Sequence, residues 1–163
     1  MLPLTRPSIV TVPFDHPDAA VLRDAQRAEL AARYGTPDSE PGPAPTAADS
    51  AVFLLARDAD GRPIGCGGLR ELGGGLGEVK RMYVVPERRR GGVAAALLAA
   101  LEAEAAERGW THLRLETGTA QPDATAFYER CGYRRIPLYG PYVGSALSVC
   151  YERRLCAAPD RSS

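Results

Sequence analysis

Features that mark several common classes of protein are missing from this sequence of 163 residues. No apolar run approaches the roughly 18 residues that a membrane-spanning helix needs. The 20 Lys and Arg residues balance 20 Asp and Glu residues, so the chain has no overall field that would draw it to nucleic acid or to an anionic membrane. Residues 1–6 do not begin a basic segment followed by an apolar one, so we expect no signal peptide and a cytoplasmic protein.

Residues that bind metals are scarce as well. The two histidines, His16 and His112, are too far apart in sequence to share one helix face, and the cysteines form no C-x-x-C pair. These patterns predict no zinc site and no other metal. The four cysteines, which we expect to be reduced and buried as small hydrophobic residues, are Cys66, Cys131, Cys150 and Cys156.

Lysine is almost absent, because Lys80 is the only one in the chain. Covalent chemistry through a lysine could therefore use that position alone. Lys80 falls inside an expected strand, next to Arg81. We expect it to have a structural or solvated role.

The remaining composition, with 45% hydrophobic and 25% charged residues, is typical of a single globular domain. We expect this domain to span residues 1–156, followed by a frayed tail at 157–163. Hydrophobic periodicity and the positions of Pro and Gly predict its elements. The expected strands are 8–12, 51–56, 63–69, 77–85, 112–117, 133–138 and 146–155, and the expected helices are 17–34, 93–108 and 122–131.

Two of these segments carry further expectations. Residues 36–50 contain four prolines and no large apolar residue, which predicts a long surface loop that is either a connector or a wall of a binding site. Regular alternation along 77–85 would place alternate residues on opposite faces of the sheet. One face would then carry Val79, Arg81, Tyr83 and Val85, and the other Glu78, Lys80, Met82 and Val84.

The turn between strand 77–85 and helix 93–108 is the segment that indicates chemistry. It reads Pro-Glu-Arg-Arg-Arg-Gly-Gly over residues 86–92. A glycine-rich turn that leads into a helix leaves the first helical N–H groups free to bind an anion, and the three arginines add positive charge. The turn lacks the Gly-Lys-Ser/Thr ending of a Walker loop, which argues against a nucleotide-phosphate binder. The alternative is a solvated arginine run at an ordinary helix start.

The segment Arg89-Arg-Gly-Gly92-Val-Ala94 fits the pattern R/Q-x-x-G-x-G/A and resembles the acyl-CoA-binding motif of the GNAT superfamily of N-acetyltransferases. Leu115-Glu116 and the later run from Ala124 through Tyr128 to Gly132-Tyr133 extend the similarity, which is detailed over residues 77–135. The resemblance implies an α+β fold of the α/β/α type. Its sheet would be mixed, mostly antiparallel and six- to seven-stranded, with helices on both faces.

The resemblance also implies acetyl-CoA as co-substrate. The backbone of Met82, Tyr83 and Val84 would pair with the pantetheine arm. The pyrophosphate would be held by Arg89, Arg90, Gly91, Gly92, Val93 and Ala94. Gln121 occupies a position where the family pattern usually has Asn, so whether its longer side chain contacts the cofactor stays open.

For the chemistry, the resemblance places Tyr128 at the position of the general acid that protonates the leaving thiolate, beside the cofactor. A tyrosine is protonated at pH 7 and can donate that proton, although Tyr128 also lies on a buried stripe with Phe127 and could be simple core. Glu116 and Glu78 are the two carboxylates that could take the amine proton, directly or through water, and the remaining alternative is bulk water or another group. Either could instead be a strand carboxylate paired with an arginine, such as Arg81 or Arg114.

The expected activity is therefore transfer of an acetyl group from acetyl-CoA to a primary amine, by direct attack within a ternary complex. The acceptor would be a small molecule or a peptide. It would bind near Tyr34, Glu78, Glu116, Tyr139 and Tyr142. The alternative is a non-catalytic acyl-CoA-binding sensor or partner domain of the same fold. An edge strand could also pair across a homodimer, but the sequence does not fix the oligomeric state.

Overall fold

The computed structural model describes residues 6–35 and 46–155. The predicted tail at 157–163, Cys156 and residues 36–45 of the expected loop lie outside these described residues. Within the described parts, no helix is both long enough and apolar enough to cross a membrane.

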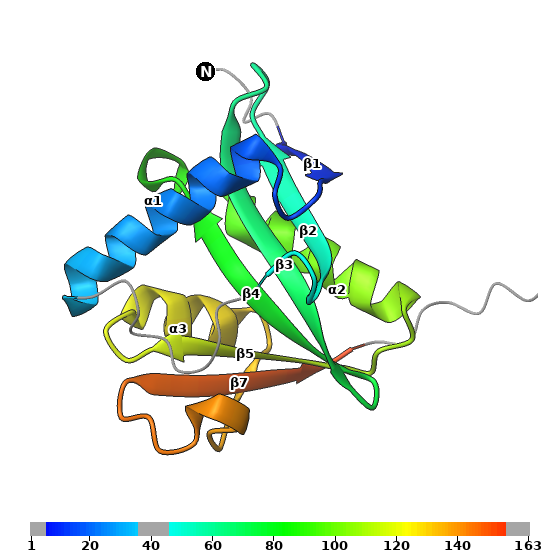
Figure 1. Ribbon diagram of the computed structural model, residues 1–163, viewed down its shortest axis with the longest axis vertical. Coiled ribbons are helices and arrows are strands. Elements are labelled where there is room, and N and C mark those ends of the chain that lie inside the picture. The colour runs from blue at the N-terminus through cyan, green and yellow to red at the C-terminus, as the bar shows by residue number, and fades with distance from the viewer. Residues whose placement is uncertain (1–5, 36–45, 156–163) are drawn as a thin grey trace, which may run out of the picture.

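A seven-stranded sheet forms the centre of the molecule, with the strand order β1-β2-β3-β4-β5-β7-β6 (Figure 1). The strands are β1 (Ser8–Thr11), β2 (Ser50–Arg57), β3 (Pro63–Gly73), β4 (Leu76–Val84), β5 (His112–Gly118), β6 (Arg134–Ile136) and β7 (Ser148–Arg154). All neighbours are antiparallel except β4 and β5, which are parallel. The predicted mixed, mostly antiparallel sheet is confirmed.

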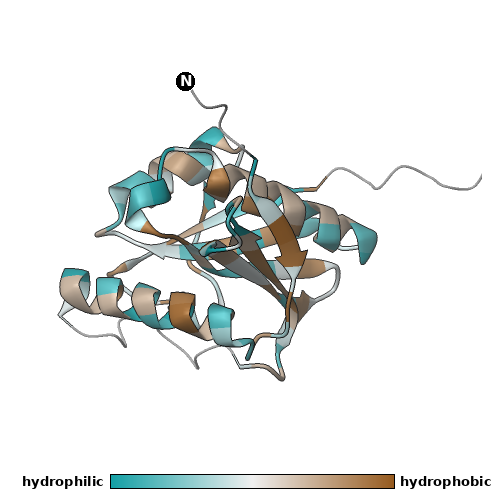
Figure 2. Ribbon diagram, turned by 90° about the horizontal axis from the view of Figure 1, so that it is seen from above, coloured by the Kyte–Doolittle hydropathy of each residue, from teal (hydrophilic) through white to brown (hydrophobic). Residues whose placement is uncertain are grey.

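The helices cover both faces of this sheet. Helix α1 (Pro17–Tyr34) packs on one face, and α2 (Val93–Glu107) and α3 (Pro122–Arg130) lie on the opposite side (Figures 1 and 2). Two short 3-10 turns, Pro86–Arg88 and Gly140–Tyr142, complete the described elements. The predicted helices match the observed ones within one residue at each end, because Pro begins α1 and α3 and Gly follows closely after each helix.

Helix α2 provides most of the core on its side of the sheet. Its buried residues are Val93, Leu97, Leu98, Leu101 and Ala105, and Figure 2 shows apolar strands lying between helices of mixed hydropathy. The helix approaches β3 so closely that a Cβ on Gly67 would come within 3.1 Å of a Leu101 methyl group. This close packing fixes the position of the turn that precedes α2.

Strands β4 and β5 pair only at one end. Leu76, Gly77 and Glu78 of β4 lie beside His112, Leu113 and Arg114 of β5, and beyond these residues the two strands separate (Figure 1). The edge of β4 that faces β5 therefore has no strand partner from Val79 onward.

A β-bulge lies in β4 where the strands have separated. Cys66 of β3 lies opposite Tyr83, whereas Gly68 lies opposite Lys80, so β4 contains one extra residue between these pairs. Arg81, inside the bulge, has a left-handed backbone with φ of 59°. Because Cys66 and Gly68 share one face of β3, Lys80 and Tyr83 also share a face. The predicted regular alternation along β4 is therefore wrong beyond Lys80.

Replacing Leu97 by Ala is expected to lower the free energy of unfolding by about 2–5 kcal/mol, because Leu97 is fully buried between α2 and the sheet. Val21 on α1 is 62% exposed, so Val21→Ala should change stability by less than about 0.5 kcal/mol. Urea denaturation of both variants measures the difference. Equal effects would contradict the placement of α2 in the core.

Candidate active site

A cavity of about 510 Å³ opens where β4 and β5 separate. Its walls come from α1, from the exposed end of β4, from the turn before α2, from the first turn of α2 and from α3. The sequence-predicted residues that line it are Met82, Tyr83, Val84, Arg89, Arg90, Gly92, Val93, Ala94, Gln121 and Tyr128. Gly91 was predicted to bind the cofactor but does not line the cavity. Arg88 and Ala95 line it, although the sequence did not predict them as cofactor-binding residues.

The start of α2 presents free backbone donors to this cavity. Gly92 is the N-cap, with φ of 86° and no side-chain cap, and the N–H of Ala96 is the first to bond back to Gly92. The N–H groups of Val93, Ala94 and Ala95 precede that bond and have no acceptor within the helix. The cavity therefore ends at the N-terminus of α2, a helix of 15 residues, and this N-terminus can hold an anion.

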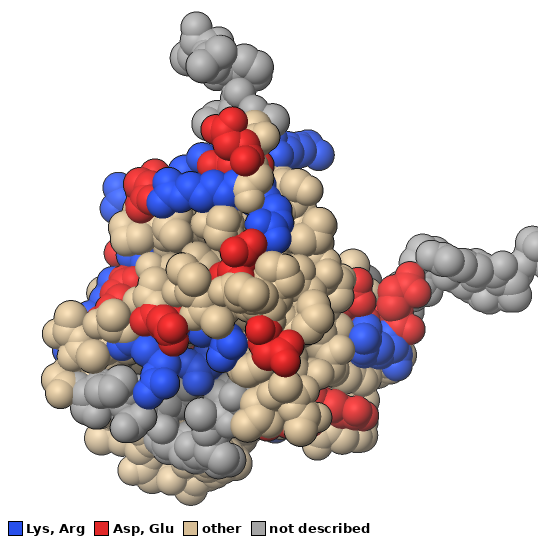
Figure 3. Space-filling view, turned by 45° about the horizontal axis from the view of Figure 1, so that its top comes forward, with Lys and Arg blue, Asp and Glu red and all other residues tan. Residues whose placement is uncertain are grey.

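The arginines of the turn have different surroundings. The Arg89 guanidinium donates to the Val84 carbonyl at 2.9 Å and to both carboxylate oxygens of Glu29 at 3.0 and 2.6 Å. This contact holds the pKa of Glu29 below its ordinary value and ties the turn to β4 and α1. Arg90 is exposed and has a left-handed backbone. Figure 3 shows basic side chains gathered between acidic ones on one face, so the neutral total conceals local charge.

The free edge of β4 is partly occupied by side chains. Gln26 of α1, which the sequence did not indicate, donates from Nε2 to the Met82 carbonyl at 2.9 Å, and Arg89 bonds the Val84 carbonyl. These contacts fix the backbone of Met82 and Val84 beside the cavity. Each carbonyl has a second lone pair, so both can still accept another hydrogen bond.

A smaller cavity of about 90 Å³ adjoins the large one. Both cavities are lined by Gln26, Leu30, Met82, Gln121 and Tyr128. Tyr34, Lys80, Arg81, Glu116 and Thr117 line the small cavity alone. The structure thus brings two of the predicted acceptor residues, Tyr34 and Glu116, to a second space beside Tyr128.

Tyr128 is both a core residue and a cavity residue. It is 8% exposed, and its ring packs against those of Phe127 and Tyr133 with centroids 5.2 and 5.8 Å away. Burial raises the pKa of its hydroxyl well above the ordinary value. The hydroxyl therefore keeps its proton at neutral pH at the boundary between the two cavities.

Glu116 is half-buried in the small cavity. Burial raises the pKa of its carboxyl group, while Lys80 and a hydrogen bond with Ser148 act in the opposite direction. A carboxylate in these surroundings is a stronger base than one in water.

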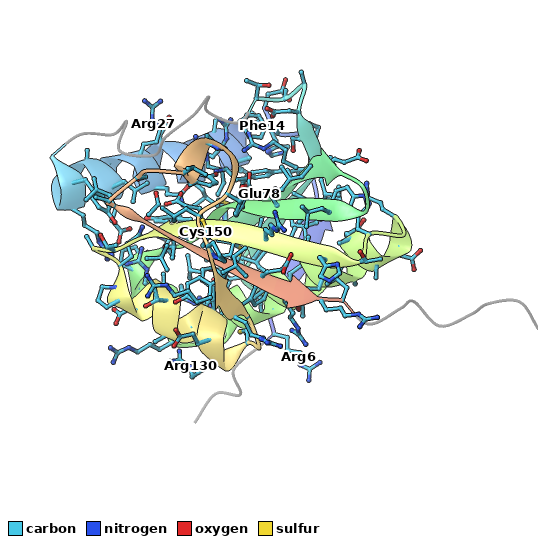
Figure 4. The ribbon with its side chains drawn as sticks, turned by 90° about the horizontal axis from the view of Figure 1, so that it is seen from below. Arg6, Phe14, Arg27, Glu78, Arg130 and Cys150 are labelled. Atoms are coloured by element: carbon cyan, nitrogen blue, oxygen red, sulfur yellow. The ribbon has the colours of Figure 1, made fainter. Side chains whose placement is uncertain are left out.

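Glu78 lies elsewhere, and Figure 4 shows it in the interior of the fold. It is 1% exposed, forms an ion pair with Arg70 at 2.6 Å, and accepts hydrogen bonds from Tyr139 at 2.5 Å and Tyr142 at 3.1 Å. Glu78, Tyr139 and Tyr142 line neither cavity. The structure does not bring these three predicted residues to the site, because they satisfy one another in a buried network.

Of the two roles expected for Lys80, structural or solvated, the structure contradicts the solvated one. It is 8% exposed and its Nζ donates to the Tyr142 hydroxyl at 2.9 Å. Burial lowers the pKa of Lys80 to about 8, although the nearby Glu116 carboxylate opposes this shift.

The cysteines form no disulfide among the described residues. Cys66 and Cys150 are buried, Cys131 is half-buried, and all three are unpaired thiols. In the part of the chain that the structure describes, no three His, Cys, Asp or Glu side chains are grouped so that they could hold a metal ion.

Comparison with known proteins identifies the family. The model of the acetyltransferase (GNAT) family matches residues 20–133, which include the bulge, the turn and α3. The chain belongs to the GNAT family. It is therefore an acetyl-CoA-dependent N-acetyltransferase, which argues against the non-catalytic sensor and the nucleotide-phosphate binder.

Individual relatives agree with this assignment. The IAA acetyltransferase of Azospirillum brasilense is 40% identical over 104 residues, which cover 63% of this chain and 67% of that protein. The mycothiol acetyltransferase of Clavibacter sepedonicus is 42% identical over 86 residues, which cover 53% of this chain and only 28% of that longer protein. A Klebsiella pneumoniae structure assigned as an acyl-CoA N-acyltransferase has a TM-score of 0.80 and 31% identity, over 92% of this chain and 98% of its own.

The site of this GNAT enzyme fits acetyl-CoA in three respects. The helix N-terminus and the neighbouring arginines suit a pyrophosphate. The unpaired edge of β4 suits an extended arm that carries amide groups. The cavity of about 510 Å³ has room for a large ligand.

The pH dependence of stability should report on Lys80. Because burial lowers its folded-state pKa from 10.5 to about 8, the unfolded chain binds more protons than the folded chain between those two pH values. The contribution of Lys80 to the free energy of unfolding should therefore increase as pH rises from about 8 toward about 10.5.

Urea denaturation of the wild type and of Lys80→Met across this pH range measures that contribution. As pH rises, the free energy of unfolding of the wild type should increase relative to that of Lys80→Met. Lys80→Arg stays charged throughout and should run parallel to Lys80→Met. A constant difference between the wild type and both variants would contradict the burial of a titrating Lys80.

Proposed function

We propose that this enzyme transfers the acetyl group of acetyl-CoA to a primary amine by direct attack within a ternary complex. The observation that carries the proposal is the pair of adjoining cavities that share Tyr128, one suited to the donor and one to the acceptor. We place the activity in a single domain over residues 1–156. A cytoplasmic location is part of the proposal, and so is an acceptor that is a small molecule or a peptide.

In this proposal, the large cavity holds the donor. The backbone N–H groups of Val93 and Ala94, with Arg90, bind its pyrophosphate. The backbone of Met82, Tyr83 and Val84 binds the pantetheine arm, and Gln121 lines the same wall. When bound, acetyl-CoA supplies an activated acetyl group as a thioester. Arg89 orients the turn through Val84 and Glu29 rather than neutralising the anion directly.

Tyr128 serves as the general acid. Tyr128 lines both cavities, and the raised pKa keeps its hydroxyl protonated until the departing thiolate needs a proton. The rings of Phe127 and Tyr133 hold its own ring in place. A proton donor held in this way needs little reorganisation during the reaction.

Glu116 serves as the general base. An alkyl ammonium with a pKa near 10.4 must lose a proton before it can attack, at a cost of about 4 kcal/mol at pH 7. Glu116 lines the acceptor cavity, and its raised pKa makes it a better proton acceptor. We assign Glu78 a structural role, because Arg70, Tyr139 and Tyr142 already occupy its oxygens.

The names of the relatives support acetyl transfer as the reaction and leave the acceptor open. One relative is named for IAA and another for mycothiol, and these substrates are not carried over to this chain. A homodimer formed through an edge strand of the sheet, β1 or β6, stays a prediction.

Tyr128→Phe should lower kcat by about 100-fold, because it removes the proton donor. The KM for acetyl-CoA should change little, because the ring remains. Tyr133→Phe is the matched control: Tyr133 packs against Tyr128 and bonds Glu102 but lines neither cavity. Thiol release from acetyl-CoA across a panel of amines measures both variants. If kcat is the same in Tyr128→Phe as in the wild type, Tyr128 is not the acid.

Glu116→Gln should lower kcat by about 100-fold and abolish the rise of kcat with pH that titration of the base produces. Glu78→Gln should instead lower the free energy of unfolding by about 3 kcal/mol, because it leaves the Arg70 partner inadequately paired, and should keep the pH-dependent rise. Initial rates over a pH series, with urea denaturation of both variants, separate the two roles. The reverse pattern would make Glu78 the base.

A further inference from the structure

The small cavity carries an unusual combination of charges for a site that accepts an amine. Lys80 and Arg81 are consecutive residues and both line it, although consecutive residues of a regular strand point to opposite faces. The bulge at Arg81, with its left-handed backbone, makes this arrangement possible. Glu116 is the only carboxylate among the described residues that line this cavity.

Arg81 is held without an anionic partner. Its Nε is buried and has no hydrogen-bond partner in the described structure, and none of the ion pairs formed by the described residues includes it. The charged groups that act on it most are Arg23 and Arg27 of α1, which together with burial lower its pKa. Figure 4 shows Arg27 pointing outward from α1, so its charge acts on Arg81 from a distance.

Gln26 adds a second unsatisfied group to the same cavity. Its Oε1 is buried without a partner, while its Nε2 is fixed on the Met82 carbonyl. Gln26 and Arg81 both line this small cavity, and Arg81 also borders a third cavity of about 10 Å³ beside Phe14 and Asp49. A ligand that has both an anionic acceptor group and an N–H donor would satisfy both residues.

We propose that the acceptor is an α-amino acid, whose carboxylate binds the Arg81 guanidinium while its amino group lies between Glu116 and Gln26. This inference rests on the proposed function, because it names the substrate class of the acceptor cavity. A zwitterion matches a cavity in which cationic and anionic groups face one space, whereas a simple alkyl amine would leave Arg81 uncompensated.

The size and walls of the cavity fit this class of substrate. A volume of about 90 Å³ equals about three water molecules at roughly 30 Å³ each, enough for an amino group and a carboxylate. Leu30, Tyr34 and Leu147 complete the lining. These residues suit an apolar side chain that extends from the cavity.

The decisive comparison uses matched acceptors that differ only in the carboxylate. Thiol release is measured with L-leucine and L-leucinamide, with L-phenylalanine and L-phenylalaninamide, and with the corresponding decarboxylated amines. The free amino acids should have a KM at least about tenfold lower than their amides and amines, because a charge-assisted hydrogen bond is lost without the carboxylate. Equal or lower KM values for the amides would overturn the proposal.

Variants then connect the preference to Arg81. Arg81→Met should raise the KM for the amino acids at least about tenfold and leave the KM for the amides and for acetyl-CoA unchanged. Arg81→Lys should restore part of the preference. Arg134→Met, on the exposed strand β6 far from either cavity lining, is the control for loss of one arginine. A preference that persists in Arg81→Met would also overturn the proposal.

A binding measurement keeps this test separate from the proposed activity. Isothermal titration calorimetry with L-leucine and L-leucinamide is carried out on the protein saturated with CoA. Binding of L-leucine that Arg81→Met abolishes supports the amino-acid site even if no acceptor releases thiol, in which case only the proposed reaction fails. Turnover of amines without selective binding of amino acids leaves the reaction intact and refutes this inference.

Discussion

The site depends on the separation of β4 and β5, which pair in parallel only from Leu76 to Glu78 of β4. Once the strands part, backbone groups of β4 that would otherwise bond a neighbouring strand are left to face a cavity. A buried polar backbone must find partners, so this edge is suited to a ligand that bonds like a strand. The bulge at Arg81 occurs where the pairing has ended, and it changes the alternation of side chains along β4 beside the two cavities.

Packing on both sides keeps that opening from closing. Helix α2 is fixed by apolar contacts with β3 and sets the turn that ends the large cavity. Helix α1 has fewer buried residues, Ala19 and Leu22, and is held near the site by polar contacts from Gln26 and Glu29. Away from both cavities, the network of Glu78 with its tyrosine and arginine partners connects β4 to the segment around Gly140–Tyr142. The two carboxylates near the centre of the sheet therefore have different surroundings: Glu78 is paired with Arg70 inside the fold, whereas Glu116 borders a cavity.

Much of the fold could be predicted from local signals. Proline at the first turns of α1 and α3 and glycine after the helices fixed the helix limits, and glycine turns marked the hairpin of β3 and β4. The lining of the large cavity was also largely predictable, because the turn and the first residues of α2 are contiguous in sequence. The lining of the small cavity was not, since Gln26, Lys80, Arg81 and Glu116 come from three separate elements.

By itself, the sequence determined the order of the elements, the family and the glycine-rich turn before α2, because each depends on residues close together in the chain. Only the tertiary structure decided the surroundings of the two candidate carboxylates. Glu78 and Glu116 both lie on strands at the centre of the sheet, but the first is enclosed by Arg70 and two tyrosines while the second borders a cavity. The physical reason is that the bulge and the opening between β4 and β5 depend on long-range packing, which no local pattern in the chain specifies.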